Sequence, residues 1–360
     1  QGLQGGGIGP YTQRTLELLL DSDIAADFHL LITKDQVGLI EGLRLRFPHR
    51  RITSSILHMS SQANFLHRSF DYLRTRSRKK WMPSVSHATN YLEWQIASHK
   101  LDVLHSPIQT LPLYSWRTPT IITVHDVQEL HFPENFTPQA RHARALGFWL
   151  GFEYATKIVV SYSHVKHDIV NYFKVPSDKI FVCPHAADRR WLSQPDAESA
   201  LHIRKLYNLP TSFMLYPAQT WPHKNHIGLL HAMAYMRDEL GITPPHLVCT
   251  GHVNEFYPVV ESKIQQLGLQ DHVRFLKTVP AEHLVALYQS CGFVIIPSKY
   301  EAGSYPLMEA LILGVPVLCS RVTSLPETMA NPSYTFETTP SEMANLIRRM
   351  LSEPSFSEQC

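Results

Sequence analysis

Two glutamates eight residues apart, Glu301 and Glu309, lie in the segment of the chain whose residue types best suit chemistry. This segment, residues 298–320, follows an apolar run, passes through a glycine-containing loop and enters a helical stretch at Pro306. Proline is favoured in the first turn of a helix, where free backbone amides can bind an anion. Here these are the amides of Gly303, Ser304 and Tyr305. Because carboxylates repel phosphate but accept hydrogen bonds from hydroxyl groups, the combination indicates a nucleotide-sugar site.

Three other segments place polar residues or glycines beside expected helices and strands. Lys224, in YPAQTWPHKNH (216–226), could neutralise a phosphate, although a solvated lysine in a first helical turn is the alternative. Gly5, Gly6, Gly7 and Gly9 form an expected loop before a helix that follows Pro10. This loop would let the backbone approach a phosphate or sugar, although flexible termini have similar composition. His125 closes the run ITVH, and a lone histidine there is more often structural.

The elements that must position these residues are most regular in the second half of the chain. Apolar runs at 213–218, 246–251, 273–279, 292–298 and 315–320 alternate with helical stretches at 223–238, 255–267, 281–290 and 306–313. This alternation predicts βαβ units and a parallel sheet with both faces covered. Ligands bind beyond the carboxyl ends of strands in such sheets, which is where Lys224 and Glu301 fall.

The first half repeats this pattern, with expected strands at 101–106, 120–126, 157–163 and 179–185 and a helix from about 138 to 155. A length of 360 residues favours two domains. The pattern fades into polar residues at 186–200, so we place the boundary near residue 195. We therefore predict an α/β protein with domains over residues 1–195 and 196–360.

Composition limits the function classes. The chain has 33 Lys and Arg against 31 Asp and Glu, which argues against nucleic acid as a partner. Its five cysteines are far apart and form no Cys-x-x-Cys pair, which argues against a disulfide framework or a cysteine zinc site. No apolar run approaches the roughly 20 residues of a membrane helix. We expect a cytoplasmic protein.

One stretch departs from this balance of charge. Between residues 41 and 81, ten Lys and Arg stand against two acidic residues, with aromatic side chains interleaved. The stretch 44–80 is either a solvated helix face or a patch that contacts anionic lipid headgroups or a phosphate-bearing acceptor. The second interpretation would place the protein peripherally at the inner membrane face.

Taken together, these segments resemble the retaining glycosyltransferases of the fourth sequence family, which have the GT-B fold of two facing Rossmann-like domains with parallel sheets. The resemblance runs from about residue 5 to residue 349, and its most specific mark is Glu301-x7-Glu309 followed by GVPVLCS. The strings WPHKNH, EAGSYP and SxxTSLPE look like the bacterial mannosyltransferase-type members.

The resemblance implies a role for each candidate residue. Glu309 would hold the ribose hydroxyls, Glu301 the hydroxyls of the donor hexose, and Lys224 the diphosphate leaving group. His125 would reach the donor sugar. The remaining donor contacts would come from backbone or neighbouring polar groups, namely Gly7, Gly9, Thr278, Val279, Gly303, Ser304 and Tyr305, with Thr278 and Val279 beside the base. Transfer would proceed by same-face attack without a bound metal or cofactor.

The chain departs from the family at the phosphate clamp and at its ends. Gln219 stands where members usually have a second cationic residue, so Asn225 and backbone amides would share the phosphate. The loop after Glu301 reads Ala-Gly-Ser rather than Gly-Phe-Gly. Only QGLQ precedes the glycine run, and the chain stops where members continue into a closing helix, so we expect a fragment truncated at both ends.

The expected function is transfer of a hexose, best matched by mannose from GDP-mannose, to a saccharide or lipid-linked saccharide. A catalytically impaired nucleotide-sugar-binding homologue or subunit is the alternative, and a GT-B sugar-nucleotide epimerase would need acid and base groups that the sequence does not reveal. Two short motifs are interpreted as structural. Asp21-Ser22-Asp23 is expected at a solvated helix end, and Ser324 with Glu327 is expected to form a helix capping box.

Overall fold

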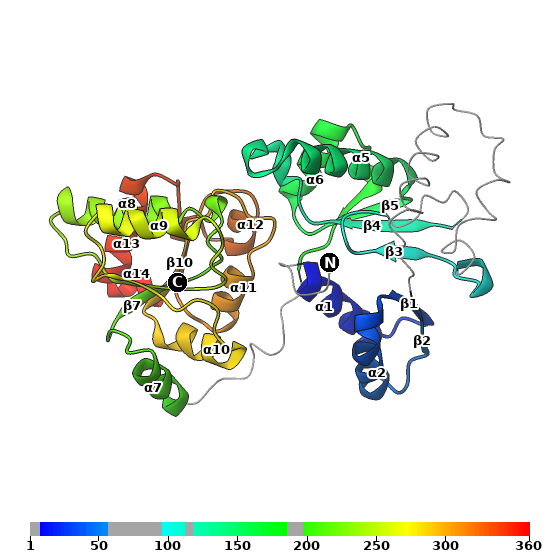
Figure 1. Cartoon of the computed structure of the whole chain (residues 1–360), viewed down its shortest axis with the longest axis horizontal. Coiled ribbons are helices and arrows are strands. Elements are labelled where there is room, and N and C mark those ends of the chain that lie inside the picture. Colours follow the sequence, from blue (N-terminus) through cyan, green and yellow to red (C-terminus); the bar gives the residue numbers. More distant parts are fainter. Residues whose placement is uncertain (1–7, 57–95, 112–117, 186–196) are drawn as a thin grey trace. The chain divides into compact units, whose positions relative to one another are not determined.

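Parallel β-sheets form the frame of both halves of the chain in the computed structural model, which describes residues 8–56, 96–111, 118–185 and 197–360 (Figure 1). The described residues fall into two units. The first comprises those within Gln1–Glu129, Phe136–Ser161 and Val165–Ala186, and the second comprises Leu130–Asn135, Tyr162–His164 and those within Ala187–Cys360. The expected boundary at residue 195 lies outside the described residues, so it stays a prediction.

The second unit contains a six-stranded sheet in the order β12-β11-β10-β7-β8-β9. Its strands are β7 (Phe213–Pro217), β8 (His246–Thr250), β9 (Val273–Phe275), β10 (Phe293–Ile296), β11 (Val317–Ser320) and β12 (Thr335–Phe336). All neighbouring pairs are parallel. The chain runs outward from β7 to β9 and then returns to the other side of β7 as β10. The sheet therefore has a topological switch point between β7 and β10, the place where ligands bind in open α/β sheets.

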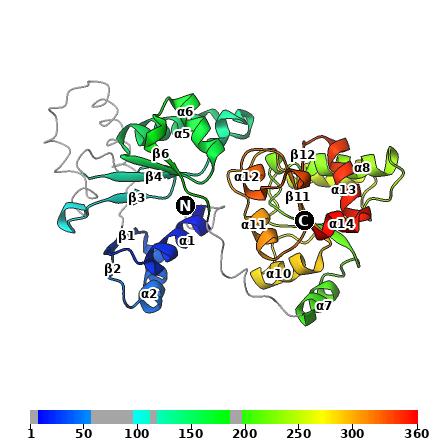
Figure 2. The same ribbon diagram turned by 180° about the vertical axis from the view of Figure 1, so that it is seen from behind.

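Helices cover both faces of this sheet, with α8 and α9 on one side and α7 and α10 on the other (Figures 1 and 2). The helices are α7 (Ala197–Leu206), α8 (His226–Asp238), α9 (Tyr257–Gln266), α10 (Ala281–Ser290), α11 (Tyr305–Ile312), α12 (Leu325–Met329), α13 (Pro340–Ser352) and α14 (Pro354–Glu358). β7, β10 and β11 are buried along their whole length, as the continuous apolar runs predict.

The first unit has a four-stranded parallel sheet in the order β3-β4-β5-β6 and a parallel pair, β1-β2. The strands are β1 (Phe28–Ile32), β2 (Ile52–Ile56), β3 (Leu104–Ser106), β4 (Thr120–Val124), β5 (Lys157–Val160) and β6 (Ile180–Val182). The helices are α1 (Ile8–Asp21), α2 (Val37–Arg46), α5 (Pro138–Tyr154) and α6 (Ser163–Phe173), the last of which begins among the residues grouped with the second unit.

Nine predicted strands are confirmed, as is the helix expected at about 138–155. Sequence patterns missed β1, β2 and β12. Three of the five residues of β2 are polar (ITSSI), and β12 has only two residues, so neither forms an apolar run. The Asp21-Ser22-Asp23 triplet lies at the end of α1, as expected, where the Ser22 hydroxyl donates to Leu19 O. The expected capping box at Ser324 is wrong. The Ser324 hydroxyl makes no cap and donates instead to the carbonyl of Glu301.

Most of the basic stretch, residues 57–80, lies outside the described residues. The four arginines of its described part bind nearby groups of the first unit. Arg50 donates to Leu20 O and Ile24 O, Arg44 donates to Ile52 O, and Arg46 and Arg51 pair with Glu17 and Asp27. Among the described residues, no helix is both long and apolar enough to cross a membrane.

Candidate functional site

The connections after β7 and β10 carry the two oppositely charged candidates of the second unit. Lys224 ends the short 3-10 turn η6 (Pro222–Lys224) that joins β7 to α8. Glu301 lies in the loop between β10 and α11. Since β7 and β10 are neighbours in the sheet, both side chains stand at its switch point although 77 residues separate them.

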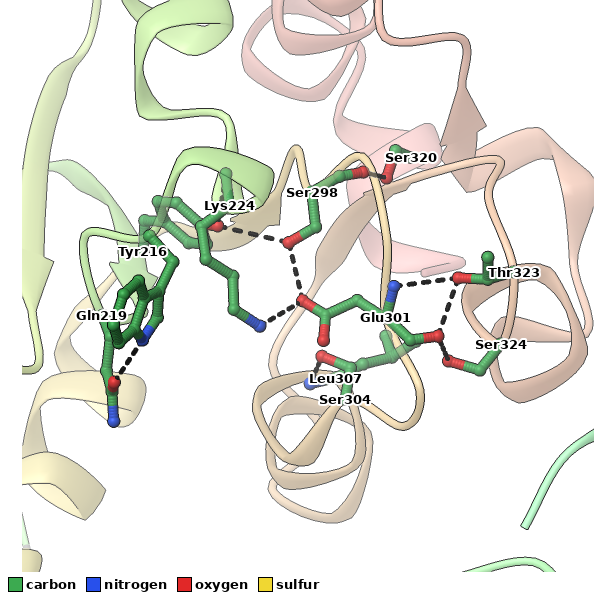
Figure 3. A network of polar contacts seen from close by, with 11 residues as sticks. Tyr216, Gln219, Lys224, Ser298, Glu301, Ser304, Leu307, Ser320, Thr323 and Ser324 are labelled. Carbon is green, nitrogen blue, oxygen red and sulfur yellow. Dashed lines mark hydrogen bonds and ion pairs between the residues drawn. The ribbon is translucent and has the colours of Figure 1, made fainter. Parts of the chain in front are cut away.

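Lys224 and Glu301 form an ion pair, with 2.7 Å between Lys224 Nζ and Glu301 Oε1 (Figure 3). The Ser298 hydroxyl donates to the same oxygen at 2.6 Å. The Glu301 side chain is only 7% exposed and that of Lys224 is 20% exposed. Two donors thus hold one carboxylate oxygen, and no described residue donates to the other, Oε2, which can accept a hydrogen bond from a ligand.

The backbone at Glu301 is fixed by the connection that follows β11. Glu301 N donates to Thr323 Oγ1 at 2.9 Å, and the hydroxyls of Thr323 and Ser324 both donate to Glu301 O, at 2.7 and 3.0 Å (Figure 3). Ser320, the last residue of β11, donates to Ser298 O. The loop is therefore ordered by side chains of the neighbouring strand and its turn, which places the carboxylate before any ligand arrives.

Lys224 is positioned through its own backbone and through the residue that follows it. The buried Tyr216 hydroxyl donates to Lys224 O at 2.7 Å. Asn225 adopts a left-handed conformation (φ 58°) and caps α8, with its side-chain oxygen accepting from Gly228 N. Its side-chain nitrogen donates to Pro297 O at 3.0 Å. The Asn225 amide thus links the connections after β7 and β10, a structural task beside the phosphate contact expected from the sequence.

Glu309 lies in the second turn of α11 and is anchored from α10. The hydroxyl of Tyr288 donates to Glu309 Oε2 at 2.7 Å. Burial, with the nearby Glu309 charge, raises the pKa of Tyr288 well above its usual value, so the phenol stays protonated and acts as a donor. At the start of α11, the buried Ser304 side chain accepts from Leu307 N at 3.4 Å and serves as the N-cap. Gly303 and Tyr305 flank this cap.

The remaining candidates of the second unit follow β7 and β9 at the same sheet edge. The Gln219 side-chain oxygen accepts from Trp221 Nε1 at 2.7 Å (Figure 3). Thr278 is exposed, and the partly buried Val279 packs on the core. Gly251, which follows β8, lies between these connections. A Cβ atom there would stand 2.7 Å from Ala218 O, and its φ is +133°.

In the first unit, His125 follows β4 and its Nε2 lies 2.7 Å from Pro107 O. A carbonyl can only accept, so Nε2 carries the proton and Nδ1 is left as an acceptor. Burial lowers the pKa of His125 despite opposing effects from Pro107 and Asp126, which favours the neutral ring. Asp126 and Glu129 both pair with Arg144 of α5 and so anchor this loop.

The ring of Tyr11, in the first turns of α1, packs edge-on against His125 with 4.6 Å between centroids. Gly9 is buried in this same helix, whereas the sequence placed it in a loop before the helix. This expectation is corrected, since α1 begins at Ile8, before Pro10. Gly7 lies outside the described residues.

Sequence patterns did not single out Ser298, Tyr288 or Thr323 as site residues. Ser298 lies two residues after the buried strand β10. A polar residue at the carboxyl end of a buried strand could therefore have indicated that Ser298 belongs to the site. Tyr288 and Thr323 gave no comparable signal, because their partners Glu309 and Glu301 lie 21 and 22 residues away. Among the described residues, no group of three or more His, Cys, Asp or Glu side chains could hold a metal ion.

The second unit matches a known protein family, and most of the chain is similar to known glycosyltransferases. Residues 202–360 match the family of glycosyl transferases group 1. The chain is 27% identical over 238 residues to O-antigen chain mannosyltransferase B of Escherichia coli, covering 66% of the chain and 62% of that protein. It is 26% identical over 226 residues to D-inositol 3-phosphate glycosyltransferase of Corynebacterium glutamicum (strain R), covering 60% and 53%. The matched part of the chain thus spans less than two thirds of either relative.

Among solved structures, Anabaena Alr3699/HepE in complex with UDP and glucose superposes with a TM-score of 0.67 at 15% identity. The match covers 99% of this chain and 90% of HepE. The α/β architecture with parallel sheets in two units, together with this likeness, confirms the GT-B fold predicted from the sequence.

Proposed function

We propose that the protein is a retaining hexosyltransferase that transfers a hexose from a nucleotide-sugar donor to a saccharide or lipid-linked saccharide. The proposed hexose is mannose, and the proposed donor is GDP-mannose. The observation that carries the proposal is the Lys224–Glu301 pair at the switch point, with Glu309 eight residues farther along. The name of the Escherichia coli mannosyltransferase favours mannose as the donor sugar. The UDP and glucose in the HepE complex make a uridine donor the first competitor to test.

Lys224 can serve Glu301 and a diphosphate together. Its ammonium has three N–H donors, of which the ion pair with Glu301 occupies one. The other two can donate to the oxygens of a leaving diphosphate, where negative charge develops as the bond to the sugar breaks. Fixed charges and amides that face such a developing charge lower the barrier. The amides of Gly303, Ser304 and Tyr305 would add to this stabilisation.

The acceptor atoms are suited to hydroxyl groups of the donor. Glu301 Oε2 would accept from a hydroxyl of the hexose, and Glu309 would accept from the ribose hydroxyls. His125 is neutral with Nδ1 as an acceptor and would bind another sugar hydroxyl. We propose same-face attack with retention and without a bound metal.

We also propose donor contacts by Gln219, Asn225, Thr278, Val279, Gly7 and Gly9. We also propose that residues 1–195 bind the acceptor and residues 196–360 the donor, in the cytoplasm. Contact of residues 44–80 with anionic lipid is a separate proposal, and co-sedimentation with liposomes that did not depend on anionic lipid would remove it.

A catalytically impaired nucleotide-sugar-binding subunit is the second candidate. The observation in its favour is Gln219, because this side chain supplies no cation for the diphosphate and its oxygen already accepts from Trp221. Such a subunit would bind the donor but leave it intact.

The deciding experiment combines donor binding with turnover. Binding of GDP-mannose and UDP-glucose is measured by calorimetry, and slow hydrolysis, with water as acceptor, is followed by NMR. The anomer of the glycoside formed when methanol replaces water as acceptor reports retention or inversion, because a glycoside does not mutarotate. Lys224→Met and Glu309→Gln should weaken binding or turnover, whereas Lys263→Met, at a partly exposed position on α9, should not. Binding without turnover over a panel of saccharide acceptors would favour the subunit, and no binding of either donor would exclude both functions.

A further inference from the structure

Tyr288 is a fully buried tyrosine whose hydroxyl donates to an acidic side chain rather than to the backbone. It lies on α10, and its oxygen is 2.7 Å from Glu309 Oε2 on α11. The carbonyl of Pro306 is also near, but at 3.4 Å. A phenol has one proton to donate, and the short contact with a carboxylate takes it.

The contact restrains a side chain that the helix alone leaves mobile. Glu309 is only partly buried and has several rotatable bonds, so a fixed donor at Oε2 narrows the positions that its carboxylate can sample. Tyr288 is itself immobile within the core of the second unit. A phenylalanine would fill the same volume, so packing does not require the hydroxyl. The hydrogen bond from this hydroxyl therefore restrains the orientation of the Glu309 carboxylate.

We propose that Tyr288 is a positioning residue that fixes the Glu309 carboxylate for the ribose, and thereby sets the preference of the site for nucleotides with ribose hydroxyls. This inference rests on the proposed function, in which Glu309 accepts from the ribose. A carboxylate oriented in advance loses no freedom when the nucleotide binds, which strengthens the contact. A nucleotide without the hydroxyls gains nothing from that orientation.

The test compares GDP and UDP with their 2′,3′-dideoxy counterparts by calorimetry, using whichever base the wild-type chain binds more tightly. The discrimination ratio is the Kd of the dideoxy nucleotide divided by that of the ribonucleotide. A hydrogen bond to a charged group implies a wild-type ratio of about 10- to 100-fold. In Tyr288→Phe the ratio should fall at least about threefold, because the carboxylate loses the donor that fixes Oε2 and binds the hydroxyls less well.

Tyr334→Phe is the matched control. Tyr334 is also buried in the second unit, and its hydroxyl donates to the backbone oxygen of Phe356 at 3.1 Å. Both variants lose one buried hydrogen bond and should lose similar thermal stability, but Tyr334→Phe should keep the wild-type ratio. Replacing Tyr288 with 4-aminophenylalanine restores an N–H donor at the same place and should restore the ratio. This variant also keeps the test open if Tyr288→Phe does not fold.

The outcomes separate this inference from the proposed function. No binding of GDP or UDP by the wild-type chain overturns both. Binding without discrimination overturns the assignment of Glu309 to the ribose, and with it the role of Tyr288. A wild-type ratio that persists in Tyr288→Phe, or that 4-aminophenylalanine fails to restore, overturns the role of Tyr288 and leaves the proposed function standing.

Discussion

Replacing Lys224 with methionine should destabilise the protein mainly by leaving Glu301 without its counter-charge. Methionine keeps much of the apolar stem of lysine but removes the ammonium that lies 2.7 Å from Glu301 Oε1. At an effective dielectric constant of about 20, two charges 4 Å apart attract by about 4 kcal/mol. Glu301 is 6% exposed, so water cannot replace the lost partner.

The expected loss in free energy of unfolding is about 2–3 kcal/mol. This is less than the 3–5 kcal/mol typical of breaking a wholly buried pair, because Lys224 is 20% exposed and its removal also relieves some desolvation. Glu301→Gln alone should lose only about 1 kcal/mol, since Lys224 can turn toward water and the amide oxygen can still accept from Ser298. The double variant should then be more stable than Lys224→Met by about 1–2 kcal/mol.

Urea unfolding of the wild type, both single variants and the double variant forms a double-mutant cycle that measures this coupling. Losses that add to within about 0.5 kcal/mol would refute the claim that Lys224 neutralises Glu301. A ligand measurement on the same proteins gives an independent check. Glu301→Gln should bind GDP or UDP about three- to tenfold more tightly, because the ammonium no longer shares its charge with a carboxylate. Unchanged or weaker binding would contradict this.

Variants at three further positions test how the site is held. Asn225→Ala should lose about 2–3 kcal/mol of stability in urea unfolding, through the lost cap and the left-handed backbone (φ 58°), and Asn225→Gly about 1 kcal/mol less; equal losses would contradict the strain argument. Gly251→Ala should lose about 2–4 kcal/mol, because the new Cβ atom would stand 2.7 Å from Ala218 O; a loss below about 1 kcal/mol would show that the loops can separate. Burial lowers the pKa of His226 to about 3, so protonation favours the unfolded state and stability should fall as the pH drops from about 6.5 toward 3. His226→Leu should reduce that slope by up to about 1.4 kcal/mol per pH unit, and an unchanged slope would assign the acid sensitivity to other groups.

The amino-acid sequence by itself determined the regular elements and the chemical character of two connections. Continuous apolar runs separated by helix-length stretches identified β7, β8, β10 and β11, because strands buried on both faces have no polar alternation. Lys224, Glu301 and Glu309 were selected by residue type and by their place after a strand or within the next helix. These are local properties, because each depends only on residue type and on the neighbouring strand or helix.

Only the tertiary structure decided which of these groups meet. Lys224 pairs with Glu301 because the sheet order makes β7 and β10 neighbours, and no local pattern encodes that order. Ser324 is an example in which the local spacing predicted the wrong hydrogen-bond partner. Its spacing to Glu327 suits a capping box, yet its hydroxyl donates to Glu301 O, a partner that the fold brings within 3.0 Å. A hydroxyl or carboxylate takes whichever partner the packed chain presents, so hydrogen-bonded pairs between distant segments follow from strand order and packing rather than from sequence spacing.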